Sequence, residues 1–242
     1  MIQPERIMVA LDVDELAEAK IIAEDLKNTG VTFKIGNQLG TYEGWKAAVA
    51  FAHEYGARIF CDTKFKDIPE TVKKSARAIT RHRPEFFNIM ADTDPVVLAA
   101  AVEGMNSAVN EFTLPKPTIL GVTVLTSFTD DACRSVYGGD PRQKVLQFAS
   151  SAAQAGLDGI VCSAEEAAML RANDATKDLL LVTPGIRPTW AASGDQSRIM
   201  TPKMAINAGA DYLVIGRPIT SPPAEIGTPK HALEKIMEEI NG

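Results

Sequence analysis

Three short stretches of the chain share one pattern, in which a helix-like segment ends at a glycine and an apolar, strand-like run begins almost at once. They are Tyr-Gly-Ala-Arg-Ile-Phe at 55–60, Ala-Gly-Leu-Asp-Gly-Ile at 155–160 and Ala-Gly-Ala-Asp-Tyr-Leu at 208–213. A repeated strand–helix unit leaves such an echo in a sequence. The repeat predicts an α/β protein with a parallel sheet, because alternating strands and helices favour parallel pairing.

Strand-like and helix-like patterns alternate over the whole chain. Eight strand–helix units in 242 residues fit a closed (β/α)8 TIM barrel, with an open doubly wound sheet as the alternative. We favour the barrel because polar residues follow many different strands. No linker or shift in composition divides the chain, so residues 1–242 are expected to form a single barrel domain. The predicted strands cover 7–11, 32–35, 58–61, 86–90, 118–125, 159–162, 179–183 and 212–215.

Helical periodicity and glycine stops place helices between these strands. The polar connection before Asp140 leaves room for one more short helix. The predicted helices cover 14–28, 42–55, 69–81, 95–105, 141–156, 165–171 and 231–240.

Composition narrows the class of protein. Apolar residues make up 45% and charged residues 23%, as in soluble globular proteins, and the net charge of −6 argues against non-specific nucleic-acid binding. No run approaches the ~20 apolar residues of a membrane span, and the first residues lack a signal-peptide pattern. The widely spaced Cys61, Cys133 and Cys162 are expected to be reduced, mostly core-filling thiols. We expect a cytoplasmic protein without membrane or nucleic-acid partners.

The segment Asp62-Thr63-Lys64-Phe65-Lys66-Asp67-Ile68-Pro69 directly follows the third predicted strand. Side chains alternate along a strand, so Asp62 and Lys64 are expected on one side, with Asp67 three residues further on. Two carboxylates beside an ammonium favour its charged form. A Schiff-base lysine needs the opposite environment, so the pattern indicates a lysine that donates a proton.

Structural roles are alternatives for the same residues. Asp67 and Glu70 fit the pattern of a helix N-cap with its capping-box partner, and Pro69 fits the first helical turn. Asp62 and Lys64 could equally form a simple ion pair at the end of a strand.

Polar residues also follow the other predicted strands, where a barrel carries its chemistry. Lys34 interrupts an otherwise apolar strand, so its charge needs a partner unless it extends to solvent. Asp12 either joins the site or braces the first helix. In order, the strand ends carry Asp12, Lys34, Asp62 with Lys64, Met90, Thr126 with Ser127, Ser163, Arg187 and Arg217.

The loops after the last two strands suggest a phosphate site. The segment 187–198 is long and polar, and loops of this length are usually functional or disordered. The eighth strand ends in Gly216-Arg217-Pro218, and barrels commonly hold phosphate after strands seven and eight. Arg217 could also form a structural ion pair. The histidines, His53, His82 and His231, fall on or beside helices, which leaves acid–base chemistry to lysine and aspartate.

Together these segments resemble the orotidine 5′-monophosphate decarboxylase family over nearly the whole chain. The resemblance implies a (β/α)8 homodimer with active sites at the subunit interface and no metal or organic cofactor. It implies conversion of orotidine 5′-monophosphate to uridine 5′-monophosphate and CO₂ in de novo pyrimidine biosynthesis. The segments that carry it are Ala10-Leu11-Asp12, Lys34-Ile35-Gly36, Asp62-x-Lys64-x-x-Asp67-Ile68-Pro69-x-Thr71, Thr123-Val124-Leu125-Thr126-Ser127, Pro184-Gly185-Ile186-Arg187, Gly194-Asp195-Gln196 and Val214-Ile215-Gly216-Arg217-Pro218.

The resemblance also implies roles for single residues. Lys64 would protonate C6 of the pyrimidine as CO₂ leaves, and Asp62 would press against the substrate carboxylate. Lys34 and Asp67 would complete the charged network. The remaining expected contacts are Asp12 and Lys34 to the ribose, Thr126 to the pyrimidine, Gln196, Gly216 and Arg217 to the phosphate with Arg187 close by, and Asp67 and Thr71 reaching across from the partner subunit.

Two positions depart from the family pattern, which commonly has histidine at the place of Lys66 and Val-His-Ala where this chain has Ile89-Met90-Ala91 followed by Asp92. Neither departure removes a member of the charged set.

Three rival functions remain. Sugar-phosphate enzymes resembling 3-keto-L-gulonate 6-phosphate decarboxylase and hexulose phosphate synthase share the Asp-x-Lys-x-x-Asp motif, but they carry a glutamate near the place of Lys34 and use Mg²⁺. A Schiff-base aldolase would need a lysine in apolar surroundings. A silent phosphate-binding barrel is expected to have lost Asp62, Lys64 or Lys34, and all three are present.

Overall fold

The computed structural model describes residues 2–191 and 200–242 of the chain. Within them the strands β1 to β8 pair in parallel, each with the next, and β8 pairs with β1, so that the sheet closes into a barrel. The predicted (β/α)8 barrel is confirmed, and the open sheet is excluded. The strands are β1 (Ile7–Leu11), β2 (Thr32–Ile35), β3 (Arg58–Phe65), β4 (Phe86–Met90), β5 (Thr118–Val122), β6 (Gly159–Val161), β7 (Leu180–Thr183) and β8 (Tyr212–Ile215).

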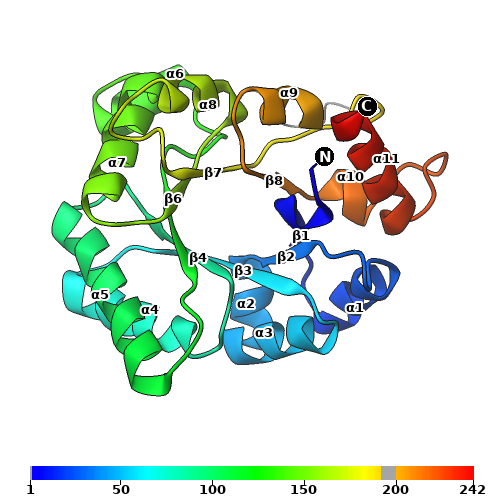
Figure 1. Cartoon of the computed structure of the whole chain (residues 1–242), viewed down its shortest axis with the longest axis horizontal. Helices are drawn as coiled ribbons and strands as arrows, with labels where there is room; N and C mark the ends of the chain where they lie inside the picture. Colours follow the sequence, from blue (N-terminus) through cyan, green and yellow to red (C-terminus); the bar gives the residue numbers. More distant parts are fainter. Residues whose placement is uncertain (1, 192–199) are drawn as a thin grey trace.

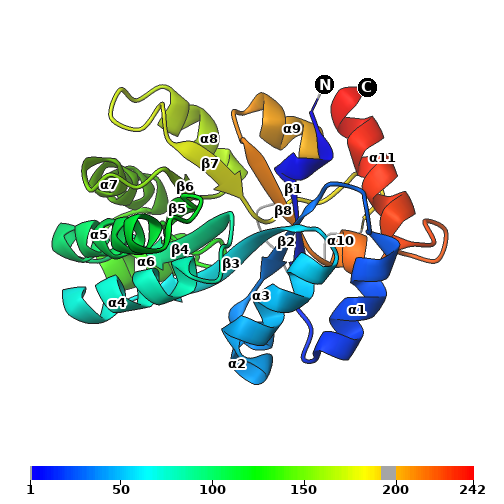
Figure 2. The same ribbon diagram turned by 60° about the horizontal axis from the view of Figure 1, so that its bottom comes forward.

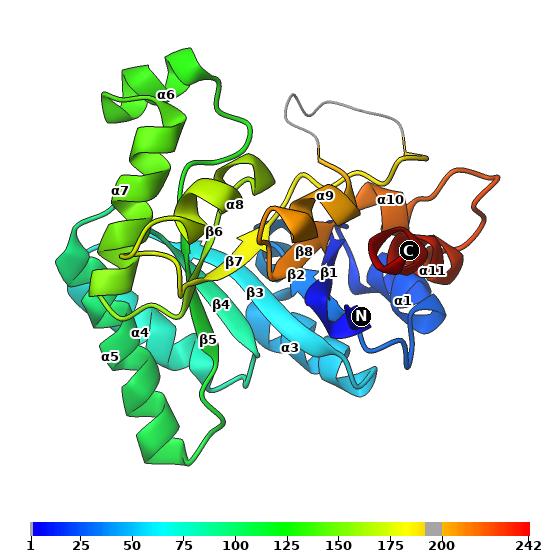
Figure 3. The same ribbon diagram turned by 45° about the horizontal axis from the view of Figure 1, so that its top comes forward.

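The helices surround the barrel (Figure 1). A short 3-10 helix, η1 (Pro4–Arg6), precedes β1, and α6 lies beyond one end of α7 at the margin of the molecule (Figure 3). The helices are α1 (Leu16–Asp25), α2 (Asn37–Glu43), α3 (Trp45–Glu54), α4 (Pro69–Thr80), α5 (Pro95–Phe112), α6 (Asp130–Tyr137), α7 (Pro141–Gln154), α8 (Ala164–Arg171), α9 (Pro202–Asn207), α10 (Arg217–Thr220) and α11 (Pro229–Asn241).

Alternation along the strands divides the core into two layers. One set of strand side chains packs inside the barrel as a separate cluster, and the alternate set packs outward against the helices. The inner cluster consists of Met8, Ala10, Phe60, Phe86, Leu120, Val182 and Val214. Residues two positions beyond a member of the inner cluster therefore also face the inside of the barrel.

Several predicted boundaries differ from the observed ones. The single helix expected over 42–55 is two helices, because Gly44 between them has a φ of +81°. Helix α5 continues past residue 105 to Phe112 and is followed by its C-cap, Thr113, which adopts a left-handed φ of 51°. Strand β3 extends beyond residue 61 to Phe65, and β5 stops at Val122.

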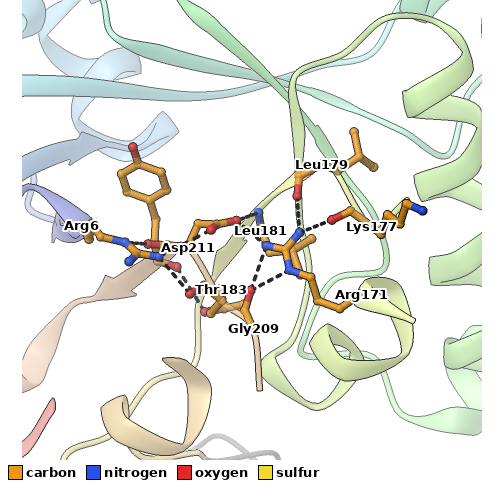
Figure 4. Close-up of polar contacts among 10 residues, drawn as sticks. Arg6, Arg171, Lys177, Leu179, Leu181, Thr183, Gly209 and Asp211 are labelled. Carbon is orange, nitrogen blue, oxygen red and sulfur yellow. Dashed lines mark hydrogen bonds and ion pairs between the residues drawn. The ribbon is translucent and has the colours of Figure 1, made fainter. Parts of the chain in front are cut away.

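A polar cluster joins β7, β8 and α8 at the end of the barrel where the strands begin (Figure 4). The Arg171 guanidinium on α8 donates to the carbonyl oxygens of Gly209, Lys177 and Leu179 and pairs with Asp211. The Asp211 carboxylate also accepts the Leu181 N–H at 2.8 Å and pairs with Arg6. This cluster ties the last strands to the segment before β1, where the barrel closes.

The two ends of the chain meet beside the barrel (Figure 2). The Ile2 N–H donates to Asn241 Oδ1 at 2.8 Å. Cys61, Cys133 and Cys162 are buried free thiols, as predicted. None of the helices in the described parts of the chain has the length and apolar character needed to cross a bilayer.

Candidate active site

Four charged side chains alternate in sign across the ends of the first three strands. Lys34 Nζ lies 2.9 Å from Asp12 Oδ1 and 3.3 Å from Asp62 Oδ2. Lys64 Nζ in turn lies 2.6 Å from Asp62 Oδ1. The order is Asp12, Lys34, Asp62, Lys64, and we call these four residues the charge chain. The sequence prediction that Lys34 has a nearby partner and that Asp62 and Lys64 share one side is confirmed.

Strand register explains why these residues meet. Ala10 on β1 pairs with Lys34 on β2, and Lys34 pairs with Phe60 on β3. Ala10 and Phe60 belong to the inner cluster, so Lys34 also faces the inside of the barrel. Asp12 and Asp62 each follow two residues later, on the same face and one step nearer the carboxyl end of the strands. The Lys34 ammonium therefore extends between the two carboxylates.

The two central residues of the charge chain, Lys34 and Asp62, are held in their ionised forms. Burial alone would lower the pKa of Lys34, but Asp62 and Asp12 outweigh that effect, so its pKa lies above the ordinary value. Burial would raise the pKa of Asp62, but Lys34, Lys64 and a hydrogen bond from Asn88 outweigh it, so its pKa lies below the ordinary value. The Lys34 and Asp62 side chains are only 9% and 13% exposed, so each of these charges depends on its partners.

Gly36 leaves the space that the first ion pair occupies. A Cβ added at Gly36 would lie 3.3 Å from both Asp12 Oδ1 and Lys34 Nζ. A larger residue would therefore press on the contact between Asp12 and Lys34, which gives a physical reason for glycine in the Lys34-Ile35-Gly36 segment.

A cavity of about 330 Å³ opens beside the charge chain, within the usual size range of small-molecule sites. Thr126, Arg187, Gly216 and Arg217 lie on its wall together with the whole charge chain. The structure thus brings together eight of the predicted site residues, from the ends of β1, β2, β3, β5, β7 and β8.

Two arginines also line the cavity. Arg187 follows β7 and is only 8% exposed, and its N–H donates to the Met200 carbonyl at 3.1 Å. Arg217 is exposed and begins the short helix α10 directly after Gly216. The predicted contact Gln196 lies outside the described residues.

Asp67 and Thr71 do not line this cavity. Both are exposed, at the start of α4 and just before it. Asp67 does not flank Lys64 of its own chain, because its Oδ1 accepts the Ile68 N–H at 2.7 Å instead. The capping interpretation of Asp67 is also wrong, since Ile68 is the N-cap and no side chain caps this helix.

The other residues that follow strands have structural surroundings. Ser163 is a helix cap, since its Oγ accepts the Glu165 N–H at 3.2 Å. Cys162 lines the cavity, but burial raises the pKa of its thiol, which disfavours the nucleophilic thiolate.

Over the described ranges no group of three or more His, Cys, Asp and Glu side chains could hold a metal ion. The absence of a metal from the reaction itself stays a prediction.

Two features of the site were missed from the sequence. Asn88 on β4 donates from Nδ2 to Asp62 Oδ1 at 2.6 Å, and Asp92 after β4 pairs with Lys66 at 2.7 Å. The available signal for Asn88 was an amide within the apolar run Phe-Phe-Asn-Ile-Met at 86–90. A buried amide needs hydrogen-bond partners, but the sequence does not say which residues supply them.

A comparison with protein families matches residues 5–236 to the model described as the Orotidine 5′-phosphate decarboxylase / HUMPS family. The chain belongs to this family. Among similar curated proteins, the orotidine 5′-phosphate decarboxylase of Moorella thermoacetica is 39% identical over 238 residues, which cover 98% of this chain and 92% of that protein. The enzyme of the same name from Heliobacterium modesticaldum is 38% identical over 98% of this chain and 97% of its own length.

Solved structures of the same fold agree with this assignment to the decarboxylase family. The orotidine 5′-phosphate decarboxylase of Lactobacillus acidophilus superposes with a TM-score of 0.83 and 32% identity, covering 98% of this chain and 99% of that one. An uncharacterized conserved protein from Geobacillus kaustophilus gives a TM-score of 0.82 and 29% identity, covering 97% and 100%. The resemblance seen in the sequence is confirmed, as is its implication that the chain is an enzyme of the carboxy-lyase kind.

Proposed function

We propose that this member of the decarboxylase family converts orotidine 5′-monophosphate to uridine 5′-monophosphate and CO₂ in de novo pyrimidine biosynthesis. The charge chain and two arginines on the wall of one cavity are the observation that carries the proposal. The substrate has a phosphate at one end and a carboxylate at the reacting carbon. Arg187, Arg217 and the Gly216 amide suit the phosphate, and the charge chain suits the reacting end.

In the proposed reaction the bond between C6 and the carboxyl group breaks, CO₂ leaves, and the electron pair stays on C6. Lys64 then gives one proton from Nζ to C6, which completes the product. Asp62 would lie against the departing carboxylate, and Lys34 and Asp12 would hold the ribose while Thr126 contacts the pyrimidine. An ammonium next to negative charge that develops at carbon stabilises the transition state more than the ground state.

The proposal includes catalysis without a metal or organic cofactor. The family description also covers enzymes named HUMPS, and a metal-dependent sugar-phosphate reaction is the rival. The position of Lys34 argues against that rival, because its ammonium lies between the Asp12 and Asp62 carboxylates at 2.9 and 3.3 Å. The Lys34 and Lys64 ammonium groups already balance the charge of these two carboxylates and would repel a divalent cation.

We further propose a homodimer in which Asp67 and Thr71 of one subunit complete the active site of the other. Both residues are exposed and lie outside the cavity of their own chain. Their neighbour Ile68 is 66% exposed, and Val96 in the first turn of α5 is 62% exposed. Exposed apolar side chains beside polar ones that do not line the cavity of their own chain suit a surface that a second subunit covers.

The decisive experiment measures CO₂ release and loss of orotidine 5′-monophosphate by the purified protein, with and without EDTA. We expect turnover that EDTA leaves unchanged and that Lys64→Ala abolishes. Lys116→Ala is the control, since Lys116 is 52% exposed and pairs with Asp158 away from the cavity. Absence of turnover by the wild-type protein would overturn the proposal, and sugar phosphates with Mg²⁺ would then be tried.

A further inference from the structure

One polar side chain lies inside the barrel at a position where its strand is otherwise apolar. Asn88 is fully buried in the middle of β4 and is two residues from Phe86 of the inner cluster, so it faces the barrel interior. An unpaired amide in this place would destabilise the fold. The hydrogen bonds of the side-chain amide therefore stabilise the fold, and all of them are made with residues of β3.

Asn88 makes hydrogen bonds with three consecutive residues of β3. Its Nδ2 donates to Asp62 Oδ1 at 2.6 Å, and its Oδ1 accepts the Lys64 N–H at 2.7 Å. Its backbone carbonyl accepts the Thr63 hydroxyl at 2.6 Å. The orientation of the amide follows from these partners, because a backbone N–H can only donate and a carboxylate can only accept.

The hydrogen bonds lie where the pairing of β3 and β4 is irregular. Cys61 pairs with Phe87, but the next pair is Phe65 with Ile89, so four steps along β3 match two steps along β4. Lys64 lies within this bulge and has a φ of 48°, a left-handed conformation that costs energy for a residue with a side chain. The side-chain oxygen Oδ1 of Asn88, in place of a backbone carbonyl on β4, accepts the hydrogen bond from the Lys64 N–H.

The bulge and the amide together set the position of the Lys64 ammonium. Asp62 Oδ1 accepts hydrogen bonds from Asn88 Nδ2 and Lys64 Nζ, both at 2.6 Å. Asp62 Oδ2 forms an ion pair with Lys34 Nζ at 3.3 Å. The rotation of the carboxylate is thus fixed from two sides. The same amide holds the backbone from which the Lys64 side chain starts.

We propose that Asn88 is a positioning residue, which holds the Asp62 carboxylate and the left-handed backbone of Lys64 in the arrangement that proton transfer to C6 requires. The inference rests on the proposed function for its effect on turnover. Its structural part, that the conformation of β3 depends on this amide, can be tested without substrate.

The kinetic test uses Asn88→Ala and Asn88→Asp. For Asn88→Ala we expect kcat to fall by about 10²-fold, as for an ångström-scale misplacement of a reacting group, with KM changed much less. Thr176→Val is the matched control, because Thr176 is 1% exposed and its hydroxyl donates to the Leu170 carbonyl at 2.8 Å, far from the cavity. It should lower the melting temperature and leave kcat unchanged.

Asn88→Asp separates positioning from general damage. At neutral pH a second carboxylate would face Asp62, and like charges repel. At lower pH a protonated Asp side chain can donate to Asp62 and accept from the Lys64 N–H, as the amide does. We therefore expect the ratio of variant to wild-type kcat to rise as the pH falls for Asn88→Asp and to stay constant for Asn88→Ala. A ratio independent of pH in both variants would contradict the positioning role.

A crystal structure of Asn88→Leu makes the inference independent of activity. We expect Lys64 to leave the left-handed region and Asp62 Oδ1 to lose its 2.6 Å contact with Lys64 Nζ. Unchanged Lys64 and Asp62 would overturn the inference even if the enzyme decarboxylates its substrate. If Asn88→Leu shows the changed geometry and the wild-type protein has no turnover, the structural part of the inference stands and the proposed function alone is overturned.

Discussion

Lys66 and Asp92, which are 26 positions apart in the sequence, form an ion pair of 2.7 Å at the carboxyl ends of β3 and β4. These are the two segments in which the chain departs from the usual pattern of its family. Asp92 is 7% exposed, and its Oδ2 also accepts the Tyr137 hydroxyl at 3.0 Å. Burial and Asp92 raise the pKa of Tyr137 to about 12. Asp92 therefore joins α6 to the segment that leads from Lys64 to Asp67.

A double-mutant cycle measures the coupling between Lys66 and Asp92. Lys66→Ala leaves the buried Asp92 carboxylate without its cation, and we expect each single change to cost about 1–3 kcal/mol in unfolding free energy. Lys66→Ala with Asp92→Asn should cost less than the sum, with a coupling of about 0.5–3 kcal/mol. Urea denaturation measures these values. Lys66→Ala with Lys177→Ala is the control pair, because Lys177 lies on the opposite side of the barrel, and additivity is expected there.

The charge chain predicts how stability depends on pH. Asp62 has a pKa below its ordinary 3.8, so its contribution is present above that value and is lost as the pH falls through the lowered pKa. Lys34 has a pKa above its ordinary 10.5, so its contribution is complete below that value and is lost as the pH rises through the raised pKa. The difference in unfolding free energy between the wild type and Lys34→Met should therefore be constant from about pH 6 to 9. A steady change across that range would show that the ion pairs do not stabilise the fold as described.

Shared active sites predict complementation between two inactive variants. Lys64→Ala and Asp67→Ala chains, each inactive alone, would form mixed dimers in which one of the two sites is intact. After equal amounts exchange subunits, about half of the dimers are mixed, so roughly a quarter of wild-type activity should return. Recovery of no activity despite proven subunit exchange would show that each site is built from one chain.

The polar cluster that joins β7, β8 and α8 predicts a change in unfolding free energy without a change in catalytic rate. Arg171→Ala removes hydrogen bonds to three backbone carbonyls and the ion pair with Asp211. We expect a loss of about 2–3 kcal/mol in unfolding free energy with kcat unchanged at temperatures where the protein stays folded. Arg134→Ala is the control, since its partners on α6 are exposed and such pairs contribute less than about 1 kcal/mol.

The barrel could be predicted from the sequence, because it depends on a repeated strand–helix unit with simple periods. Strand alternation predicted that Asp62 and Lys64 share one side, although Lys64 reaches its place through a left-handed backbone that alternation does not describe. Their network with Lys34 followed only from the family resemblance. Asn88 could not be predicted as part of the site, because its partners lie on another strand and depend on a bulge in the register. The proposed role of Asp67 requires a second subunit, about which one chain's periodicity carries no information.

The unequal exposure of the two lysines has a consequence for the catalytic cycle. A turnover that takes a proton from Lys64 leaves an uncharged amine beside Asp62, and the enzyme is ready again only after that amine has been recharged. The Lys64 side chain is 33% exposed, so bulk water reaches its amine, whereas the Lys34 side chain is 9% exposed and is largely shielded from water. Under the proposed mechanism the hydrogen at C6 of the product would originate in the solvent, and uridine 5′-monophosphate made in heavy water would carry one deuterium there.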